Sequence, residues 1–218
     1  ELDVGALAFT ATGIFSFEFA TPPALPSGWT LTGTGGTSGA VTNLSATEGS
    51  QFAFINTPGV TTTAHGGTGG STLESPFFTA QIGDELSIDF NFLTSDGTLN
   101  FRDFLFVQLR DGSNGVIATI GNANTEVADA QAIPAIGAAP PPPLSTGVTL
   151  SPATAFFGGV ATGPVGTVTY PAVKFQGGAG GSTGYVTSKF TISATGTYKL
   201  FIAVQDVGNQ VFSSGAAI

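Results

Sequence analysis

Four aspartates in this sequence stand at the expected ends of strands, in turns that contain glycine or asparagine. Ca²⁺ binds carboxylate and carbonyl oxygens, so carboxylates gathered at a loop junction are typical of a calcium site. The sequence has no D-x-D-x-D-G loop, however, and aspartate also favours turns by hydrogen bonding to its own backbone. We therefore expect no cofactor, with calcium as the alternative. The candidate calcium ligands are Asp96, Asp103, Asp111 and Asp206.

Few residues could support catalysis. His65 is the only histidine and lies in a glycine-rich segment, and no G-x-S-x-G elbow occurs in the chain. Glycoside hydrolysis needs two carboxylates in one cleft, and the acids that could supply them are Glu18, Glu48, Asp89 and Asp103. Acids on the outward faces of strands are more often simply solvated, and the lack of cysteine removes thiol chemistry. We expect that the protein is not an enzyme.

The elements that would position these residues are organised around the segment Leu86–Asp111. Its first half alternates apolar and polar residues, which predicts a strand with one buried face. The second half, Asp103–Arg110, is apolar on both sides, which predicts a strand that is covered on both faces. Polar residues separate the two halves, so we expect a β-hairpin at the centre of a sheet.

Short apolar segments separated by turn residues recur along the chain, and no segment has sustained helical periodicity. This pattern predicts an all-β protein, an antiparallel β-sandwich of jelly-roll type with long Gly/Pro-rich loops. The segment Thr32–Gly39 is rich in glycine and reads as a flexible loop. We expect a single domain over residues 13–218, a separate N-terminal strand within residues 1–12, and a proline-rich loop at residues 132–144.

The composition limits the partners and the compartment. The net charge is −9, from 14 acids against five bases, and the bases form no cluster, so we expect no nucleic-acid partner. No apolar stretch approaches the roughly 20 residues that span a bilayer, so we expect no transmembrane segment. The chain starts at Glu1, has no methionine and is only 9% charged, which favours a secreted, extracellular protein whose leader has been removed.

Several segments together resemble a family of secreted β-sandwich domains. The segments, in chain order, are ATEGSQFAFINT (Ala46–Thr57), LSIDFNFLTSDG (Leu86–Gly97), NFRDFLFVQLRD (Asn100–Asp111) and YKLFIAVQDVGN (Tyr198–Asn209). They resemble domains of bacterial surface proteins, many of which carry a C-terminal sorting tag of the PEP-CTERM kind. The resemblance implies export, a jelly-roll-like sandwich and a place at the cell surface or in the extracellular matrix, and it implies no reaction. In such domains an I-D-N-V segment forms the final strand, whereas this sequence stops at Ile218, so we expect the closing strand to be incomplete.

The favoured functional prediction concerns the N-terminal strand. An unfilled sheet edge can accept a strand from a neighbouring copy, and a repeated head-to-tail contact makes a filament. The donor face would consist of Leu2, Val4, Ala6 and Ala8, whose small alanines fit a narrow groove. We thus expect an extracellular structural protein, the subunit of a cell-surface or matrix filament that assembles by β-strand donation into a homopolymer.

The alternative is a monomeric carbohydrate-binding or adhesive module, calcium-dependent if the aspartates bind the ion. Its partner would be a polysaccharide. Such a module needs exposed aromatic side chains, and the candidates are Trp29, Tyr170 and Tyr185.

Overall fold

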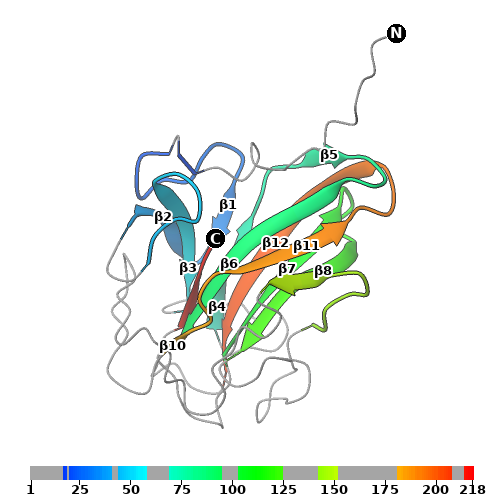
Figure 1. The fold of residues 1–218 in the computed structure, drawn as a ribbon. Helices are drawn as coiled ribbons and strands as arrows, with labels where there is room; N and C mark the ends of the chain where they lie inside the picture. Colours follow the sequence, from blue (N-terminus) through cyan, green and yellow to red (C-terminus); the bar gives the residue numbers. More distant parts are fainter. Residues whose placement is uncertain are drawn as a thin grey trace.

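The computed structural model describes residues 17–18, 20–40, 44–57, 69–94, 103–124, 142–151, 181–207 and 214–218, without the side chains of residues 124 and 181. In this part of the chain every regular element is a β-strand, and the strands form two antiparallel sheets that face each other (Figure 1). The predicted all-β antiparallel sandwich is confirmed. Residues 1–12 and most of 132–144 lie outside the described residues.

The two sheets contain thirteen described strands. Sheet A has the order β1-β4-β12-β7-β8, with β5 also paired to β12, and its strands are β1 (Thr30–Thr32), β4 (Gly69–Glu74), β5 (Phe78–Ala80), β7 (Phe104–Asp111), β8 (Val116–Asn124) and β12 (Gly196–Asp206). Sheet B has the order β2-β3-β13-β6-β11-β9, with β10 also paired to β6, and its strands are β2 (Thr34–Gly39), β3 (Gln51–Asn56), β6 (Glu85–Thr94), β9 (Thr149–Ser151), β10 (Gly181–Ser182), β11 (Val186–Thr191) and β13 (Ser214–Ala217).

Eight of these strands have the connectivity of a jelly roll. The chain enters sheet B at β3, crosses to β4 in sheet A, returns to β6 and crosses again to the β7–β8 pair. It then passes through β11, β12 and β13, so that the four-stranded cores read β3-β13-β6-β11 and β4-β12-β7-β8. This arrangement confirms the predicted jelly-roll type.

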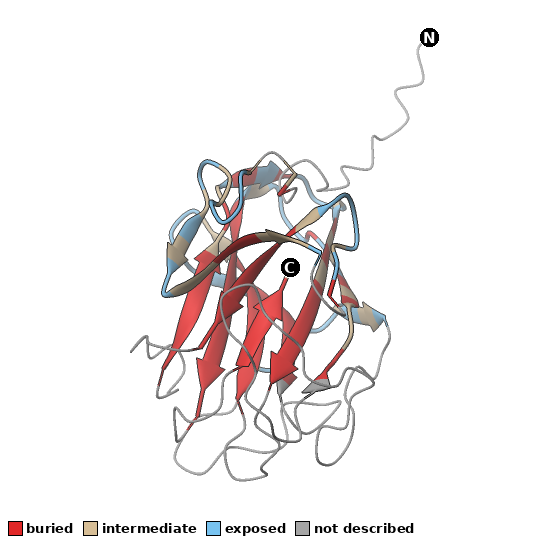
Figure 2. Ribbon diagram, turned by 90° about the vertical axis from the view of Figure 1, so that its left-hand side faces the viewer, coloured by how far each residue is buried: buried red, intermediate tan, exposed pale blue. Residues whose placement is uncertain are grey.

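The core between the sheets follows from the alternation of side chains along the strands. In β12, the longest strand, Leu200, Ile202 and Val204 are completely buried against the opposite sheet. Removing a side chain of this size from a packed core typically costs about 2–5 kcal/mol. Figure 2 shows that most of the strand residues are buried, whereas exposed residues gather in the turns and short strands at the upper end of the sandwich.

The predicted hairpin is wrong in its pairing, although both of its strands exist. β6 lies in sheet B between β13 and β11, and β7 lies in sheet A between β12 and β8. Each half of the segment is thus at the centre of its own sheet. A run of polar residues between two strands can close a hairpin or cross between sheets, and alternation along each strand is the same in both cases.

The glycine-rich segment Thr32–Gly39 is also not a loop, because it contains β2. This strand pairs with β3 along its whole length, and the Thr37 amide donates to the carbonyl oxygen of Pro23 at 3.1 Å. A Cβ on Gly36 would overlap that same Pro23 oxygen. The glycines therefore allow a second segment of backbone to approach the strand closely.

The closing strand is present, contrary to the sequence prediction. β13 lies between β3 and β6, and Ala53 and Ile218 exchange two backbone hydrogen bonds of 2.9 and 3.1 Å. Its residues are small and buried and lie opposite large ones, since Ala216 pairs with Phe92 of β6 and Ala217 pairs with Phe54 of β3. The sheet interior is thus continuous through the described strands, and no acceptor groove is left between β3 and β6.

Candidate functional site

Cationic, aromatic and exposed apolar side chains meet on the outer face of sheet A. In the strand register Lys199 of β12 lies directly opposite Arg110 of β7, and Arg110 lies opposite Val116 of β8, so these three residues share one face. Phe77, just before β5, lies on the other side of Lys199, with its ring centroid 5.3 Å from the Lys199 Nζ. Together with the next row of side chains they form what we call the outer-face band: Glu74, Phe77, Gln108, Arg110, Val116, Lys199 and Phe201.

A bulge in β8 brings Val116 onto this face. The register of β7 against β8 shifts between Leu109 and Arg110, where Leu109 pairs with Ala118 and Arg110 pairs with Val116. The extra residue, Ile117, reverses the alternation, so Ala118 points into the core while Val116 faces outward. Val116 is consequently 54% exposed at the end of the band.

The guanidinium of Arg110 is held on an aromatic ring. Its Cζ lies 3.5 Å from the centroid of the Phe201 ring, and its Nε and Nη2 donate to Gln108 Oε1 at 3.2 and 2.8 Å. Burial lowers the pKa of the Arg110 guanidinium from its ordinary value, and the negative charge of Glu74 acts in the opposite direction. The stacking and the hydrogen bonds fix the direction of the guanidinium plane before any ligand arrives.

The other cation, Lys199, forms an ion pair with Glu74. The Lys199 side chain is 11% exposed and that of Glu74 is 30% exposed, so the pair is partly shielded from water. Phe77 beside them is 53% exposed, whereas most of the phenylalanines that the structure describes are buried. The band can therefore offer a flat apolar ring, fixed donors and one acceptor carboxylate within a few side chains of each other.

The four candidate calcium ligands do not come together. Asp103 and Asp111 flank opposite ends of β7, about 25 Å apart for a strand of this length, whereas the ligands of one calcium ion lie within about 2.6 Å of it. Asp206 lies at the same end of the sandwich as Asp103, and Asp96 is outside the described residues. Among the described residues no group of three or more His, Cys, Asp or Glu side chains could hold a metal. A single site made of all four is excluded.

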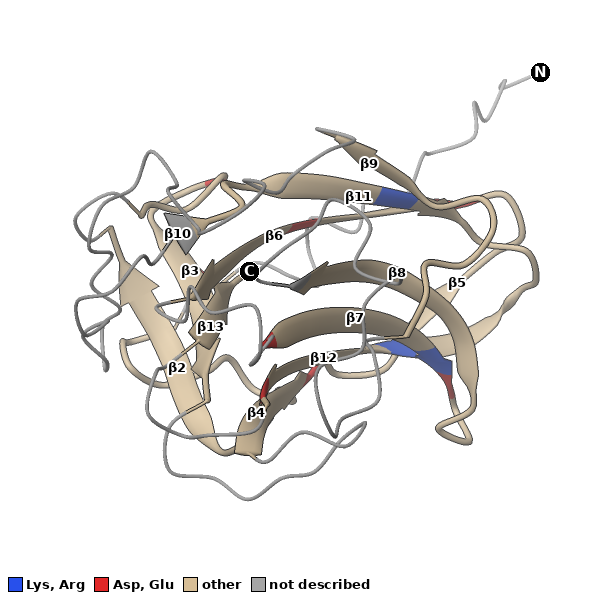
Figure 3. Ribbon diagram, turned by 90° about the horizontal axis from the view of Figure 1, so that it is seen from below, with Lys and Arg blue, Asp and Glu red and all other residues tan. Residues whose placement is uncertain are grey.

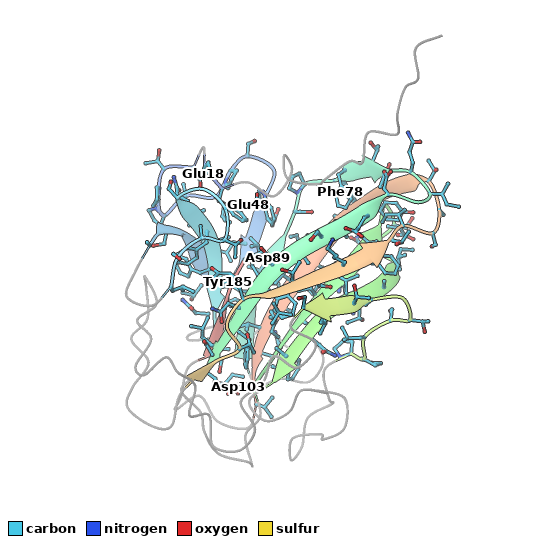
Figure 4. All side chains as sticks on the ribbon, in the orientation of Figure 1. Glu18, Glu48, Phe78, Asp89, Asp103 and Tyr185 are labelled. Carbon is cyan, nitrogen blue, oxygen red and sulfur yellow. The ribbon has the colours of Figure 1, made fainter. Side chains whose placement is uncertain are left out.

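Asp103 instead joins the two sheets at the lower end of the sandwich (Figure 4). Its carboxylate is 1% exposed and accepts hydrogen bonds from the Val207 amide at 2.9 Å and the Ser214 hydroxyl at 2.5 Å. The Ser214 oxygen also lies 2.7 Å from the Thr94 hydroxyl, and the Ser214 amide donates to the Thr57 hydroxyl at 3.0 Å. This inter-sheet polar layer anchors the beginning of β13.

Asp111 is a turn residue, as the alternative explanation for these aspartates predicts. Its Oδ1 accepts hydrogen bonds from the amides of Ser113 and Gly115, both at 2.8 Å. The turn contains Asn114 with a φ of 67°, a conformation that asparagine tolerates well.

The acids considered for glycoside hydrolysis are also dispersed. Glu18 and the exposed Glu48 belong to the upper end of the sandwich, Asp103 is at the lower end, and Asp89 is on the outer face of β6 (Figure 4). Glu18 accepts hydrogen bonds from the Ser50 amide, the Ser50 hydroxyl and the Gln51 amide at 2.6–2.8 Å, and these bonds lower the pKa of its carboxyl. The Glu18 carboxylate thus fixes its own segment to the start of β3 through these hydrogen bonds.

Of the aromatic residues predicted for carbohydrate binding, the two that the structure describes are not exposed platforms. Trp29 packs against the core, with its ring 5.0 Å from that of Phe17. Burial raises the pKa of the Tyr185 phenol, and the charge of Asp89 raises it further. Tyr170 and His65 lie outside the described residues.

The exposed aromatic residue, Phe77, was missed in the sequence. Phe77 and Phe78 are adjacent, and adjacent residues of an extended segment point to opposite faces. Phe78 is buried in the core between the sheets, which leaves Phe77 outside. The adjacent phenylalanines could have predicted that one ring is exposed. No sequence pattern could have predicted that Lys199 and Arg110 lie side by side.

The proposed donor residues Leu2, Val4, Ala6 and Ala8 lie outside the described residues. In the described part of the chain no helix has the length and apolar character needed to cross a membrane.

Comparisons with known proteins add little to this description. Neither a protein-family model nor a curated protein sequence matches the chain. Among solved structures the chain is similar to the K1 cleaved adhesin domain of Lys-gingipain from Porphyromonas gingivalis W83, with 8% identity over 89% of this chain and 96% of that chain. The TM-score is 0.30, so this likeness carries no argument. The family resemblance read from the sequence stays a prediction.

Proposed function

We propose that this chain is an extracellular adhesive module that binds polysaccharide with the outer-face band. The observation that carries the proposal is the exposed ring of Phe77 next to the Lys199–Glu74 ion pair and the stacked guanidinium of Arg110. A sugar presents an apolar face of C–H groups and a rim of hydroxyls. An aromatic ring bordered by fixed donors and an acceptor matches both.

Binding without hydrolysis fits the positions of the acids. A glycosidase places its two carboxylates within about 10 Å of each other. Asp103 is enclosed in the inter-sheet polar layer, and Glu18 is engaged by the turn before β3. The proposal therefore assigns recognition and no reaction to the module.

The test is retention of the purified protein by immobilised polysaccharides in affinity gel electrophoresis. Phe77→Ala should abolish retention, because it removes the apolar platform. Ile82→Ala is the matched control, since Ile82 is an even more exposed apolar residue, 69% against 53% for Phe77, in the turn before β6. Equal retention of both variants and the parent protein on every polysaccharide, or no retention of the parent at all, would contradict the proposal.

A second candidate function is self-assembly by strand donation. β13 fills the interior of sheet B, so a donated strand would have to add at an edge. In the described part of the chain each sheet has one edge strand of three residues, β1 in sheet A and β9 in sheet B, and the terminal residues of both strands are exposed. The predicted donor is the segment of Leu2, Val4, Ala6 and Ala8. Deleting residues 1–12 should turn filaments seen by electron microscopy into monomers by light scattering, and filaments that survive the deletion would rule out this donor.

A further inference from the structure

The few cations of this acidic chain are distributed unevenly. The sequence has five lysines and arginines against 14 acids, and three of the five lie in the described residues: Arg110, Lys189 and Lys199. Lys189 is on β11 in sheet B, where its Nζ lies 2.7 Å from the exposed Glu85. The other two are direct cross-strand neighbours on the outer face of sheet A. Figure 3 shows the two adjacent basic positions on β7 and β12 and the separate one on β11.

The two neighbouring cations, Arg110 and Lys199, share one acidic partner, Glu74. Lys199 pairs with Glu74, and the charge of Glu74 also acts on Arg110. Two positive charges therefore face a single carboxylate within the band. Two like charges placed on directly opposite strand residues repel each other, by a few tenths of a kcal/mol to about 1 kcal/mol in typical sheets. An anion bound between them would remove this repulsion.

Arg110 is also presented in a form that suits a carboxylate. Its guanidinium lies flat on the Phe201 ring and is held by Gln108 Oε1 through Nε and Nη2. A pre-oriented guanidinium loses little conformational freedom on binding, and hydrogen bonds between charged partners are about twice as strong as neutral ones. The rest of the chain is strongly negative, so a polyanion is repelled from other parts of the surface and is directed to this band.

We propose that the ligand of the outer-face band is an acidic polysaccharide, whose carboxylate or sulfate groups contact Arg110 while a sugar ring lies on Phe77 and the buried Lys199 adds positive charge next to them. This inference rests on the proposed function and adds the chemical class of the ligand. It also predicts that the affinity falls with added salt, because salt screens the attraction between the charged polymer and the partly exposed Arg110 beyond a Debye length of about 8–10 Å.

The experiment compares polygalacturonate with the same polymer after complete methyl esterification, in affinity gel electrophoresis of the unmodified chain. The two polymers share a backbone and differ in charge, so no variant has to fold for the comparison to be valid. We expect the acid polymer to retain the protein more strongly than the ester does, with an apparent dissociation constant at least about tenfold lower. Dextran sulfate compared with dextran gives the same test for sulfate.

Arg110→Gln is the matching change in the protein, and Lys189→Gln is its control because it removes the same charge from sheet B. Arg110→Gln should weaken binding of the acid at least about tenfold, with the thermal midpoint checked in parallel, and Lys189→Gln should leave it unchanged. If the ester and the acid bind equally well and Phe77→Ala still abolishes binding, the proposed function stands and the acidic ligand is wrong. If no polymer binds, both are wrong.

Discussion

Replacing Asp103 with alanine should destabilise the sandwich by about 1–3 kcal/mol. The carboxylate accepts hydrogen bonds from the Val207 amide and the Ser214 hydroxyl, and all three residues are at most 1% exposed. Without the carboxylate the buried Val207 amide loses its acceptor, whereas the Ser214 hydroxyl keeps the Thr94 hydroxyl 2.7 Å away. A buried donor without an acceptor costs about 1–3 kcal/mol, which gives the stated range.

Two further variants separate the bonds from the volume of the side chain. Asp103→Asn keeps the shape and one carbonyl oxygen, so it should cost less than the alanine variant. Ser214→Ala removes the donor on β13. Combined with Asp103→Ala in a double-mutant cycle, it should give a coupling energy of about 0.5–3 kcal/mol, because the two side chains share a hydrogen bond.

The assay is urea unfolding at neutral pH, with the free energy of unfolding taken from linear extrapolation. Asp89→Ala is the control, since it removes the same group from the outer face of β6 and should stay within about 1 kcal/mol of the parent. A loss for Asp103→Ala below about 1 kcal/mol, or equal to that of the control, would refute the assignment of Asp103 to an inter-sheet anchor.

The remaining predictions concern the turn before β3, a crossover glycine and the candidate metal ligands. The folded pKa of Glu18 is lowered by its bonds to Ser50 and Gln51, so its stabilisation is complete above the ordinary carboxyl range and is lost as the pH falls through the lowered value. The difference in urea midpoint between the parent and Glu18→Gln should shrink on acidification, and a difference that stays constant with pH would contradict this role of Glu18. Gly33→Ala should cost about 2–5 kcal/mol, because φ is +109° and the new Cβ would overlap the Ser71 hydroxyl; Gly83→Ala, with φ +93° and open space, should cost only the backbone part, and equal losses would contradict the clash. EDTA should leave the thermal midpoint unchanged, since Asp103 and Asp111 already accept hydrogen bonds from the protein, and a clear drop that calcium restores would overturn this.

Much of the secondary structure could be predicted from local patterns. The residue pattern identified the strand character of β6 and β7, the two halves of the segment Leu86–Asp111, and the buried face of β6. These features depend only on the alternation of side chains between the two faces of a strand, which can be read from neighbouring residues in the sequence. The glycines of β2 led to the wrong prediction of a flexible loop. In the structure a glycine of this strand, Gly36, leaves room for the backbone of Pro23 to lie against it.

The candidate site could not be predicted in the same way. Its lysine and arginine are 89 positions apart in the chain, and the exposed phenylalanine comes from a third segment. They become neighbours only through the register of β12 against β7 and β5. The single signal in the sequence was the adjacent pair of phenylalanines at 77 and 78, one of which had to face outward.

By itself the sequence determined the class of the fold, the inward residues of its main strands and the acidic, weakly charged character of the chain. Tertiary structure alone decided that β6 and β7 belong to different sheets, that β13 closes sheet B, and that Arg110 and Lys199 meet. The physical reason is that strand alternation is a local property, whereas pairing depends on which distant strands can bury their apolar faces together.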